Sequence, residues 1–580
     1  MTRSLAGIHP IRSHLGGEHP VAGRSRACRC GGRAMNDGSS GSRPPRRRFW
    51  WWAAIAGIVS AGAFLAVAEL IALAVARDGS PILAVGSFVI DIVPQPFKEF
   101  AIATFGENDK PVLLASLGLA VVIAAALAGV LQLLRPPLGV ITMGIAGALS
   151  VAAIVTRAGA TPLAFVPPVV GSVVGSILLV VLVRRLRAWR EAVAAPAAAP
   201  AASAPSTPAD PADPADPAQR RPAPGVDRRA FFRIAAISAA SALVVGVGAR
   251  IATATTSSIA AIRRALKLPA PRSTVVIPAG AELDIPGISP LVTPNADFYR
   301  VDTALVVPSV DPAAWRLTID GMVDRRIELS FDDLVNMGLD EYAVTLTCVS
   351  NEVGGELLGN AIWLGVPVRE VLRLASPTSG ADMVLSRSVD GFTASTPLES
   401  LTDDGLDAIL AVGMNGEPLP LEHGFPVRMV VPGLYGYVSA TKWLTELKVT
   451  RFDADEAYWT PRGYSAKAPI KLSSRIDTPR IVTAVTAGPT TIAGVAWAQP
   501  VGIEQVEVRV DDGAWQQATL ATPISGNTWV QWFLEWQATA GTHYLTVRAT
   551  DKDGTLQTEE LAPIAPDGSS GWQRLLIRVS

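Results

Sequence analysis

One cysteine stands out among the residues that could do redox chemistry. Cys348 is the only cysteine after residue 30, and it follows the alternating run Val344–Thr347, which predicts a strand. Glycines follow at positions 354, 355 and 359, so we expect the thiol where a strand opens into a loop. A soft thiolate suits a redox-active transition metal. The alternative is a buried cysteine that only packs as a small apolar group, but its neighbours up to Glu352 are largely polar.

Few other side chains could complete a metal site made from protein alone. Only His423 and His543 lie beyond residue 19, and one cysteine does not hold a metal tightly. Most ligands of a metal at Cys348 must therefore come from an organic cofactor. Three cysteines in 580 residues also exclude a disulfide framework.

A second group of residues could bind a phosphate. Residues 422–428 precede the predicted strand Met429–Val431, and a Gly-rich turn that ends in Ser439–Trp443 follows that strand. This order puts His423, Arg428 and Lys442 at the two ends of one strand and turn. Arginine binds phosphate through paired hydrogen bonds, lysine acts as a point charge, and glycines expose backbone N–H groups. A surface turn with scattered charges is the alternative.

Taken in order, these motifs resemble the sulfite-oxidase superfamily of molybdopterin-dependent oxidoreductases, in its membrane-anchored bacterial form. The resemblance covers residues 290–580, about half of the chain. In the catalytic part it rests on six strings: Asp297–Arg300, Thr345–Asn351, Ser388–Phe392, Met414–Pro420, His423–Arg428 and Ser439–Trp443. Towards the end of the chain, three strings resemble the family's dimerisation domain: Ala493–Trp497, Val506–Trp515 and Arg548–Asp551.

The resemblance implies a cofactor and a reaction. It implies a mononuclear molybdenum held by one pterin dithiolene, by oxo groups and by the thiolate of Cys348, which is then both metal ligand and catalytic residue. It implies that nine further residues line the pterin and its phosphate: Phe298, Tyr299, Arg300, Asp390, His423, Arg428, Ser439, Thr441 and Lys442. The implied reaction is oxygen-atom transfer at molybdenum, coupled to two electrons that leave or arrive one at a time.

One departure from the family concerns the substrate. In the sulfite oxidases the cysteine is followed by Asn and then by paired arginines that attract the anionic substrate, whereas here Asn351 is followed by Glu352 and Val353. Because a carboxylate repels a dianion, we expect an S-oxide or N-oxide rather than an oxyanion such as sulfite. The sequence shows no haem-attachment motif, so we expect the electron partner to be another protein or a membrane quinone. Sulfite is the first alternative substrate, and a non-catalytic, membrane-tethered binding protein is the alternative of another class.

The first of the elements around this site is a membrane anchor, which we predict in the N-terminal part of the chain. The chain is 49% hydrophobic and only 17% charged, a balance that indicates membrane segments. We predict a four-span bundle over residues 49–190, with spans at 49–76, 111–134, 138–155 and 163–183, and an interfacial piece at 81–94. Basic residues at 43–48, 135 and 184–190 all fall on one side of the predicted spans, opposite the loops 95–110 and 156–162, which are poorer in basic residues. The positive-inside rule places the basic side in the cytoplasm.

The segments around the bundle are predicted to carry no domain of their own. Residues 1–48 are predicted to be a disordered basic N-terminus whose start is Met1 or Met35, and residues 191–225 an extended Ala/Pro-rich linker. Asp227–Arg233 and the apolar run to Ala249 resemble a twin-arginine export signal within a fifth span over residues 226–254. Recognition by the twin-arginine machinery implies that the chain beyond this span is exported. The alternative is that these arginines are the ordinary basic flank of a fifth span, which also places the following part of the chain outside the cytoplasm.

Two globular domains are predicted after the fifth span. Residues 270–465 alternate between strands, such as Asp297–Val307 and Trp315–Val323, and helices, one that starts with a capping box at Ser330–Asp333 and one that begins near Pro367. This mixture indicates an α+β domain. Residues 471–580 show short alternating strands and turns, which predict an all-β immunoglobulin-like sandwich, and the resemblance implies a homodimer through it.

The predicted fold class is therefore multidomain: an N-terminal α-helical membrane bundle, an α+β sulfite-oxidase-like molybdopterin domain and a C-terminal all-β sandwich. The predicted location is the cell membrane, with several spans and an extracytoplasmic catalytic domain. The net charge of -1 gives no support for nucleic acid as a partner.

Overall fold

The computed structural model describes residues 47–75, 109–155, 163–194, 258–481 and 484–580, with isolated residues at 85–86, 88–89, 93, 104, 233 and 236. The predicted N-terminal segment (1–48), interfacial piece (81–94), linker (191–225) and twin-arginine segment (226–254) lie almost entirely outside these residues. The described residues form a helical bundle, a catalytic domain and a C-terminal domain.

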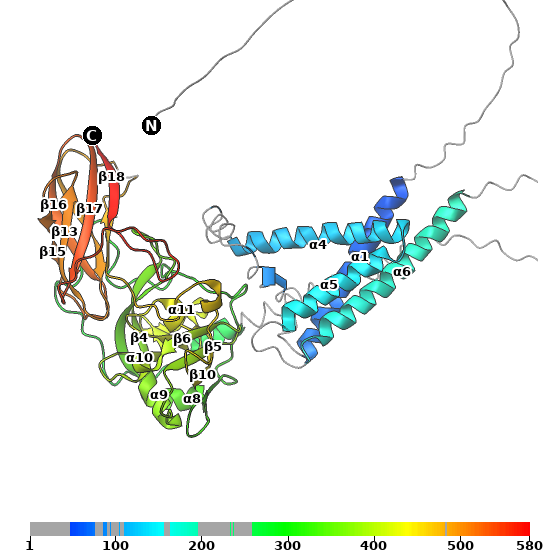
Figure 1. The fold of residues 1–580 in the computed structure, drawn as a ribbon, viewed down its shortest axis with the longest axis horizontal. Helices are drawn as coiled ribbons and strands as arrows, with labels where there is room; N and C mark the ends of the chain where they lie inside the picture. Colours follow the sequence, from blue (N-terminus) through cyan, green and yellow to red (C-terminus); the bar gives the residue numbers. More distant parts are fainter. Residues whose placement is uncertain are drawn as a thin grey trace, which may run out of the picture. The chain divides into compact units, whose positions relative to one another are not determined.

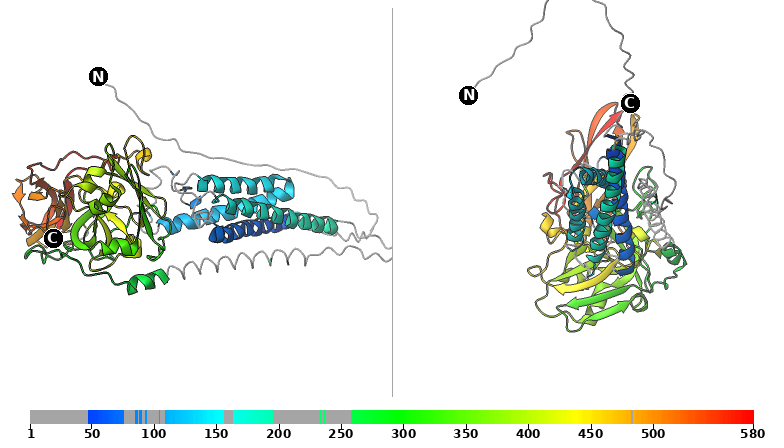
Figure 2. Two further views of the ribbon diagram at one scale, coloured as in Figure 1. Left: turned by 90° about the horizontal axis from the view of Figure 1, so that it is seen from below. Right: turned by 90° about the vertical axis from the view of Figure 1, so that its right-hand side faces the viewer.

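Four long apolar helices form the first part of the described chain: α1 (Arg47–Val75), α4 (Asp109–Leu134), α5 (Leu138–Val155) and α6 (Val166–Ala194). Each is long and apolar enough to cross a membrane, which confirms four apolar helices at the predicted spans. The helices lie side by side in all three views (Figure 1; Figure 2). Such a bundle satisfies its backbone hydrogen bonds within each helix, as a lipid environment requires.

Small residues bring the backbones of these helices close together. A Cβ atom added to Gly57 of α1 would lie 2.0 Å from the carbonyl oxygen of Ala125 in α4. A Cβ atom added to Gly171 of α6 would lie 2.6 Å from the carbonyl oxygen of Phe64 in α1. The Gly-x-x-x-Gly motif that begins at Gly171 therefore lets α6 pack against α1 at backbone distance.

The catalytic domain is built on two sheets. The first has the strand order β2-β1-β10-β5-β6, and the second has the order β3-β4-β7-β8 with β9 paired to β7. In the first sheet, β1 and β10 are parallel, whereas β1–β2 and β10–β5 are antiparallel. The strand bounds are β1 (Arg316–Gly321), β2 (Ile327–Ser330), β3 (Asp340–Thr347), β4 (Leu358–Pro367), β5 (Met383–Ser388), β6 (Thr393–Pro397), β7 (Ile409–Met414), β8 (Glu417–Pro418), β9 (Arg428–Val430) and β10 (Leu444–Thr450).

Short helices connect these strands, and two of them were predicted. The helices are α8 (Phe331–Asn336), α9 (Val368–Ala375), α10 (Leu398–Thr402), η4 (Leu421–His423), α11 (Gly436–Ser439) and η5 (Thr460–Arg462). The predicted capping box is present at α8, where Ser330 and Asp333 each accept from the other's backbone N–H. The helix predicted after Pro367 is α9, and its apolar face joins buried residues of both sheets in one core.

The strand predicted over Asp297–Val307 is wrong, whereas the strand predicted near Trp315 is present as β1. Residues 297–307 are irregular because their side chains serve the site rather than a sheet face. Phe298 packs edge-on against Trp363 in a buried cluster, and Asp302 forms an ion pair with Lys442.

A helix over residues 258–265 precedes the catalytic domain in the chain and packs on it. Ile259 of this helix is buried in the cluster that contains Phe298 and Trp363. Arg263 donates hydrogen bonds to the carbonyl oxygens of Pro418 and Leu419, at 2.7 Å for both. The chain is thus already part of this packed structure before residue 270.

The C-terminal domain consists of two packed four-stranded sheets, with the orders β11-β12-β16-β15 and β14-β13-β17-β18. One buried cluster joins the two sheets, with Ile492 and Trp532 from the first and Val506 and Val547 from the second. The strand bounds are β11 (Ser473–Thr478), β12 (Gly488–Trp497), β13 (Ile503–Val510), β14 (Gln516–Gln517), β15 (Thr519–Leu520), β16 (Val530–Ala538), β17 (Gly541–Asp551) and β18 (Gln573–Val579).

Candidate functional site

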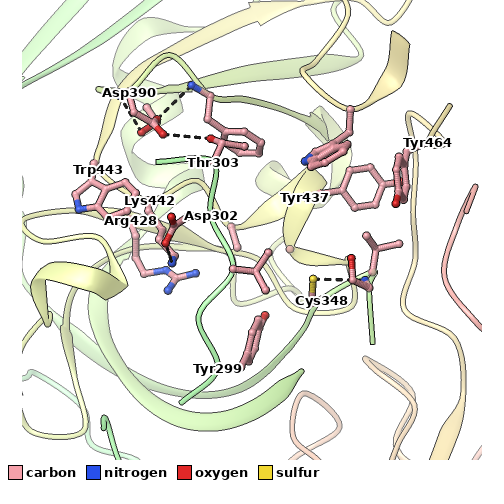
Figure 3. Close-up of a pocket in the computed structure, with 18 of the residues that line it drawn as sticks. Tyr299, Asp302, Thr303, Cys348, Asp390, Arg428, Tyr437, Lys442, Trp443 and Tyr464 are labelled. Carbon is pink, nitrogen blue, oxygen red and sulfur yellow. Dashed lines mark hydrogen bonds and ion pairs between the residues drawn. The ribbon is translucent and has the colours of Figure 1, made fainter. Parts of the chain in front are cut away.

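The ends of several strands meet at one pocket of the catalytic domain (Figure 3). Cys348 directly follows β3, Asp390 follows β5, Arg428 begins β9, and Lys442 comes shortly before β10. All four line the pocket, which holds about 880 Å³ of empty space counted out to its open mouth.

Six of the ten predicted site residues line this pocket: Phe298, Tyr299, Cys348, Asp390, Arg428 and Lys442. The other four lie outside its lining: Arg300, His423, Ser439 and Thr441. Arg300 is partly exposed, and its Nε donates to Asp302 at 3.1 Å. The hydroxyls of Ser439 and Thr441 are buried and bonded within the fold, to the carbonyls of Leu434 and Tyr435 and to the hydroxyl of Ser386 respectively.

The Cys348 thiol lies in the wall of the pocket, and its residue is only 8% exposed. The backbone N–H of Ser350 donates to the sulfur at 3.4 Å, and the N–H of Cys348 donates to the Leu357 carbonyl at 2.9 Å. Burial raises the pKa of the thiol, while the Ser350 hydrogen bonds and the charge of Lys442 act in the opposite direction. A metal bound at this sulfur would favour the thiolate.

Two buried cations occupy another side of the pocket from the sulfur (Figure 3). Lys442 Nζ donates to Asp302 at 3.1 Å and to the Glu422 carbonyl at 3.0 Å. Burial lowers the pKa of Lys442 to about 8, although Asp302 opposes the shift. Arg428 lies over the Trp363 ring at 4.9 Å, and burial lowers its pKa to about 10. Its buried Nε has no hydrogen-bond partner.

His423 supports this pair without adding charge to it. The ring Nε2 lies 3.1 Å from the Asn295 carbonyl oxygen, so Nε2 carries the hydrogen and donates it. Burial lowers the pKa of His423 to about 3, and the neighbouring Lys442 and Arg428 add to that shift. The imidazole is therefore neutral at pH 7, and its buried Nδ1 has no partner.

A glycine allows the two cations to come together. Gly424 has φ of 110°, a conformation that L residues with side chains rarely adopt. A Cβ atom there would lie 2.9 Å from Arg428 Cβ and 3.2 Å from Lys442 Cα. A larger residue at 424 would thus push apart the segments that carry the two charges.

The sequence reasoning missed an aromatic wall that lines the same pocket: Phe392, Tyr437, Trp459 and Tyr464. The rings of Tyr437 and Tyr464 are 5.5 Å apart, and those of Trp459 and Tyr464 are 5.2 Å apart. Tyr437 donates its hydroxyl to the Ser465 carbonyl at 2.7 Å, and burial raises its pKa, so the phenol stays neutral. The one available signal was the concentration of aromatic residues over 458–464.

Two further findings concern residues that the sequence analysis missed or placed wrongly. Asp302 and Thr303 also line the pocket and were missed; Thr303 donates to Asp390 at 3.2 Å. Glu352, from which repulsion of a dianion was expected, is exposed and does not line the pocket. Any discrimination against an anion must therefore come from the lining residues themselves.

The residues present fit an anionic cofactor that carries a metal. Within the part of the chain that the structure describes, no group of three or more His, Cys, Asp or Glu side chains could hold a metal ion. A thiol in the wall suits a soft metal, and two buried cations with an unpaired Arg428 Nε suit a phosphate.

Comparisons with known proteins agree with this geometry. Residues 304–459 match the family described as the oxidoreductase molybdopterin binding domain. Human mitochondrial sulfite oxidase is 31% identical over 344 residues, which cover 50% of this chain and 62% of the human protein. A nitrate reductase (NADH) of Solanum lycopersicum is 27% identical over 319 residues, which cover 44% of this chain and 35% of that protein.

A solved structure extends the comparison. The sulfane dehydrogenase SoxCD of Paracoccus pantotrophus covers 50% of this chain and 84% of its own, at 22% identity and a TM-score of 0.44. The chain spans less than two thirds of the length of the human sulfite oxidase that it resembles. The family match shows that residues 304–459 form an oxidoreductase molybdopterin binding domain, and over about half of its length the chain is similar to the sulfite oxidases.

Proposed function

We propose that the chain is a membrane-anchored, extracytoplasmic enzyme that transfers an oxygen atom to or from a small S-oxide or N-oxide type substrate. The observation that carries this proposal is the shared pocket. One wall presents the Cys348 thiol, and two buried cations, Arg428 and Lys442, line the same cavity. A thiolate-bound metal and an anionic pterin phosphate account for both features.

Each chemical role in this proposal falls to residues of the chain. Cys348 would bind the molybdenum, and Arg428 and Lys442 would bind the phosphate, with Phe298, Tyr299 and Asp390 beside the pterin. His423 would hold the Arg428 guanidinium, which donates to the His423 carbonyl at 3.2 Å. Arg300 fixes Asp302, and the Ser439 and Thr441 hydroxyls fix the turn that presents Lys442. The bound cofactor supplies the oxygen-atom transfer and the two electrons coupled to it.

The lining residues favour a neutral substrate. Arg428 and Lys442 are the only Arg or Lys side chains among the described residues that line the pocket. In the same pocket as Cys348, Tyr437 and Tyr464 offer uncharged aromatic surface, which would exclude water and bind apolar groups of a substrate. An oxyanion such as sulfite would compete with the cofactor phosphate for the two cations. Sulfite remains the second candidate because the relatives include sulfite oxidases.

The membrane part of the proposal rests on the four apolar helices and on charges at their ends. We propose that residues 49–190 anchor the chain with the basic ends in the cytoplasm. The linker (191–225) and the twin-arginine segment (226–254) would then lead to export of the catalytic domain (270–465). Electrons would pass to or from a partner protein or a membrane quinone.

We also propose an immunoglobulin-like identity for the C-terminal domain, residues 471–580, and a homodimer formed through it. The support is the pair of packed antiparallel sheets and their short strands. Sedimentation of the detergent-solubilised chain, with and without residues 471–580, tests the dimer. A monomer for the full chain would refute it.

A substrate panel tests the proposed reaction. The full chain, made in a host that synthesises the cofactor, should contain about one molybdenum per polypeptide and should turn over small sulfoxides or N-oxides. Efficient oxidation of sulfite with no sulfoxide turnover would replace the first substrate class by the second. A chain that contains no molybdenum would favour a non-catalytic binding protein.

A further inference from the structure

The strand that leads to Cys348 is held from outside the catalytic domain. β3 is an edge strand of its sheet, and Thr345, three residues before Cys348, is fully buried. The N–H of Thr345 donates to the Asn527 carbonyl at 3.0 Å, and its carbonyl accepts from Gln499 Nε2 at 2.8 Å. Its hydroxyl accepts from the N–H of Trp529 at 2.9 Å. Both backbone groups of Thr345 are therefore bonded to the C-terminal domain.

The loop after Cys348 is held from the same side. Ser569 Oγ donates to the Asn351 carbonyl at 2.6 Å, and Arg475 Nη1 donates to the Gly355 carbonyl at 2.8 Å. Arg475 is 6% exposed and forms a buried ion pair with Asp477 at 2.6 Å, which fixes its guanidinium. Two carbonyls of the loop thus accept hydrogen bonds from donors of the C-terminal domain.

The loop has few hydrogen bonds of its own beside these external ones. Leu357 closes it: its N–H donates to Asn351 Oδ1 at 2.8 Å, and its carbonyl accepts from Cys348 N–H. Within the loop, Asn351 N–H donates to the Cys348 carbonyl, and Gly355 N–H donates to the Glu352 carbonyl. The last two are tight turns, and two glycines in sequence, Gly354 and Gly355, give the backbone more freedom than other residues would. The external hydrogen bonds from Ser569 and Arg475 therefore add to the internal ones in selecting one conformation of the loop.

We infer that the C-terminal domain positions the Cys348 thiol, with Thr345, Arg475 and Ser569 as positioning residues. The role of that thiol as a metal ligand rests on the proposed function; the hold on the loop does not. None of the three lines the pocket. They act through the loop, because a metal ligand functions only when supporting contacts hold it within a few tenths of an ångström of its working position.

The test measures the reactivity of the thiol, which does not depend on turnover. The full chain is made without cofactor in a Cys28→Ser/Cys30→Ser background, so that Cys348 is its only cysteine. The rate of alkylation by iodoacetamide is followed by mass spectrometry in the parent, in Ser569→Ala and in Ser570→Ala. The neighbouring Ser570 is the matched control, because its hydroxyl donates to the Glu560 carbonyl within the C-terminal domain.

We expect Ser569→Ala to raise the alkylation rate roughly fivefold, the factor that corresponds to one hydrogen bond of about 1 kcal/mol, and Ser570→Ala to leave it unchanged. Arg475→Lys, which keeps the charge but loses the fork of donors, should have a similar effect on the alkylation rate. In the loaded enzyme, Ser569→Ala should also shift the Mo(V) electron paramagnetic resonance signal.

Two results would overturn the inference. Equal rates in the parent and Ser569→Ala would show that the hydroxyl does not hold the loop, and equal acceleration in both serine variants would show general loosening. The proposed function fails separately, if Cys348→Ser keeps full turnover. The two failures are distinguishable because the alkylation assay contains no cofactor.

Discussion

Removal of the Lys442 ammonium is the most informative change on the cofactor side of the pocket. Lys442 is 9% exposed, and its Nζ donates to Asp302 and to the Glu422 carbonyl. The change Lys442→Met keeps the length of the side chain and removes its charge. Asp302 keeps its contact with Arg300 Nε at 3.1 Å, so the carboxylate is not left without a cation.

The expected size of the effect follows from one lost charge-assisted hydrogen bond. Such a bond to a phosphate contributes about 1.5–3 kcal/mol, which corresponds to a loss of affinity of roughly 10- to 150-fold. Arg428 remains in place, so the variant should still bind the pterin, but weakly. Most of the cofactor should therefore be lost during extended dialysis.

The assay is the pterin retained per polypeptide after dialysis, read by the fluorescence of the oxidised pterin, together with the molybdenum content. Lys448→Met is the matched control, because Lys448 pairs with Asp455 at 2.8 Å and does not line the pocket. Lys442→Arg should retain more cofactor than Lys442→Met, since it keeps the charge. Full retention by Lys442→Met, or equal loss in both lysine-to-methionine variants, would refute the assignment of the phosphate to this side.

Three further predictions concern stability. His423 has a pKa of about 3 in the folded chain against about 6.5 in the unfolded chain. The free energy of unfolding of the cofactor-free chain should therefore fall by up to about 1.4 kcal/mol per pH unit as the pH drops from 6.5 towards 3. His423→Gln should flatten this pH dependence in urea titrations, and an unchanged slope would contradict the prediction. Gly57→Leu should disrupt the helix bundle, whereas Gly118→Leu, where a Cβ meets nothing within 4 Å, should not; equal thermal stability of the two in detergent would refute the close approach. Ser330→Ala should lower the free energy of unfolding by about 1 kcal/mol through loss of the α8 cap, and no change in melting temperature would show that the cap is not stabilising.

Much of the fold followed from periodicity and capping. Alternation predicted β3 before Cys348 and the strands of the C-terminal domain, and the capping box at Ser330 predicted α8. The four apolar helices followed from length and hydropathy alone. These features are local, so the residues that form them also contain the pattern that predicts them.

The site was predicted less completely because pockets are built from residues far apart in the chain. The strand prediction over Asp297–Val307 failed because consecutive residues of this segment, such as Val301, Asp302 and Thr303, all line the pocket instead of alternating between the two sides of a sheet. Spacing also could not tell that the side chains of Ser439 and Thr441 point into the fold while that of Tyr437 lines the cavity. Those directions depend on the short helix α11 and on the turn after it.

The position of Glu352 shows a second limit of prediction from sequence. Glu352 lies close to Cys348 in the chain, yet its side chain is exposed and outside the pocket lining. Proximity in sequence does not fix direction in a loop that contains two glycines. The uncharged wall of Tyr437 and Tyr464 now supports the same substrate class on a different physical basis.

The most direct measurement of the central claim is turnover by Cys348→Ser in the full chain, purified from a host that makes the cofactor. The account predicts that sulfoxide turnover is lost while the pterin content stays near that of the parent, because Arg428 and Lys442 still bind the phosphate. Turnover at the parental rate, with the serine confirmed by mass spectrometry, would contradict the role of Cys348 as the metal ligand.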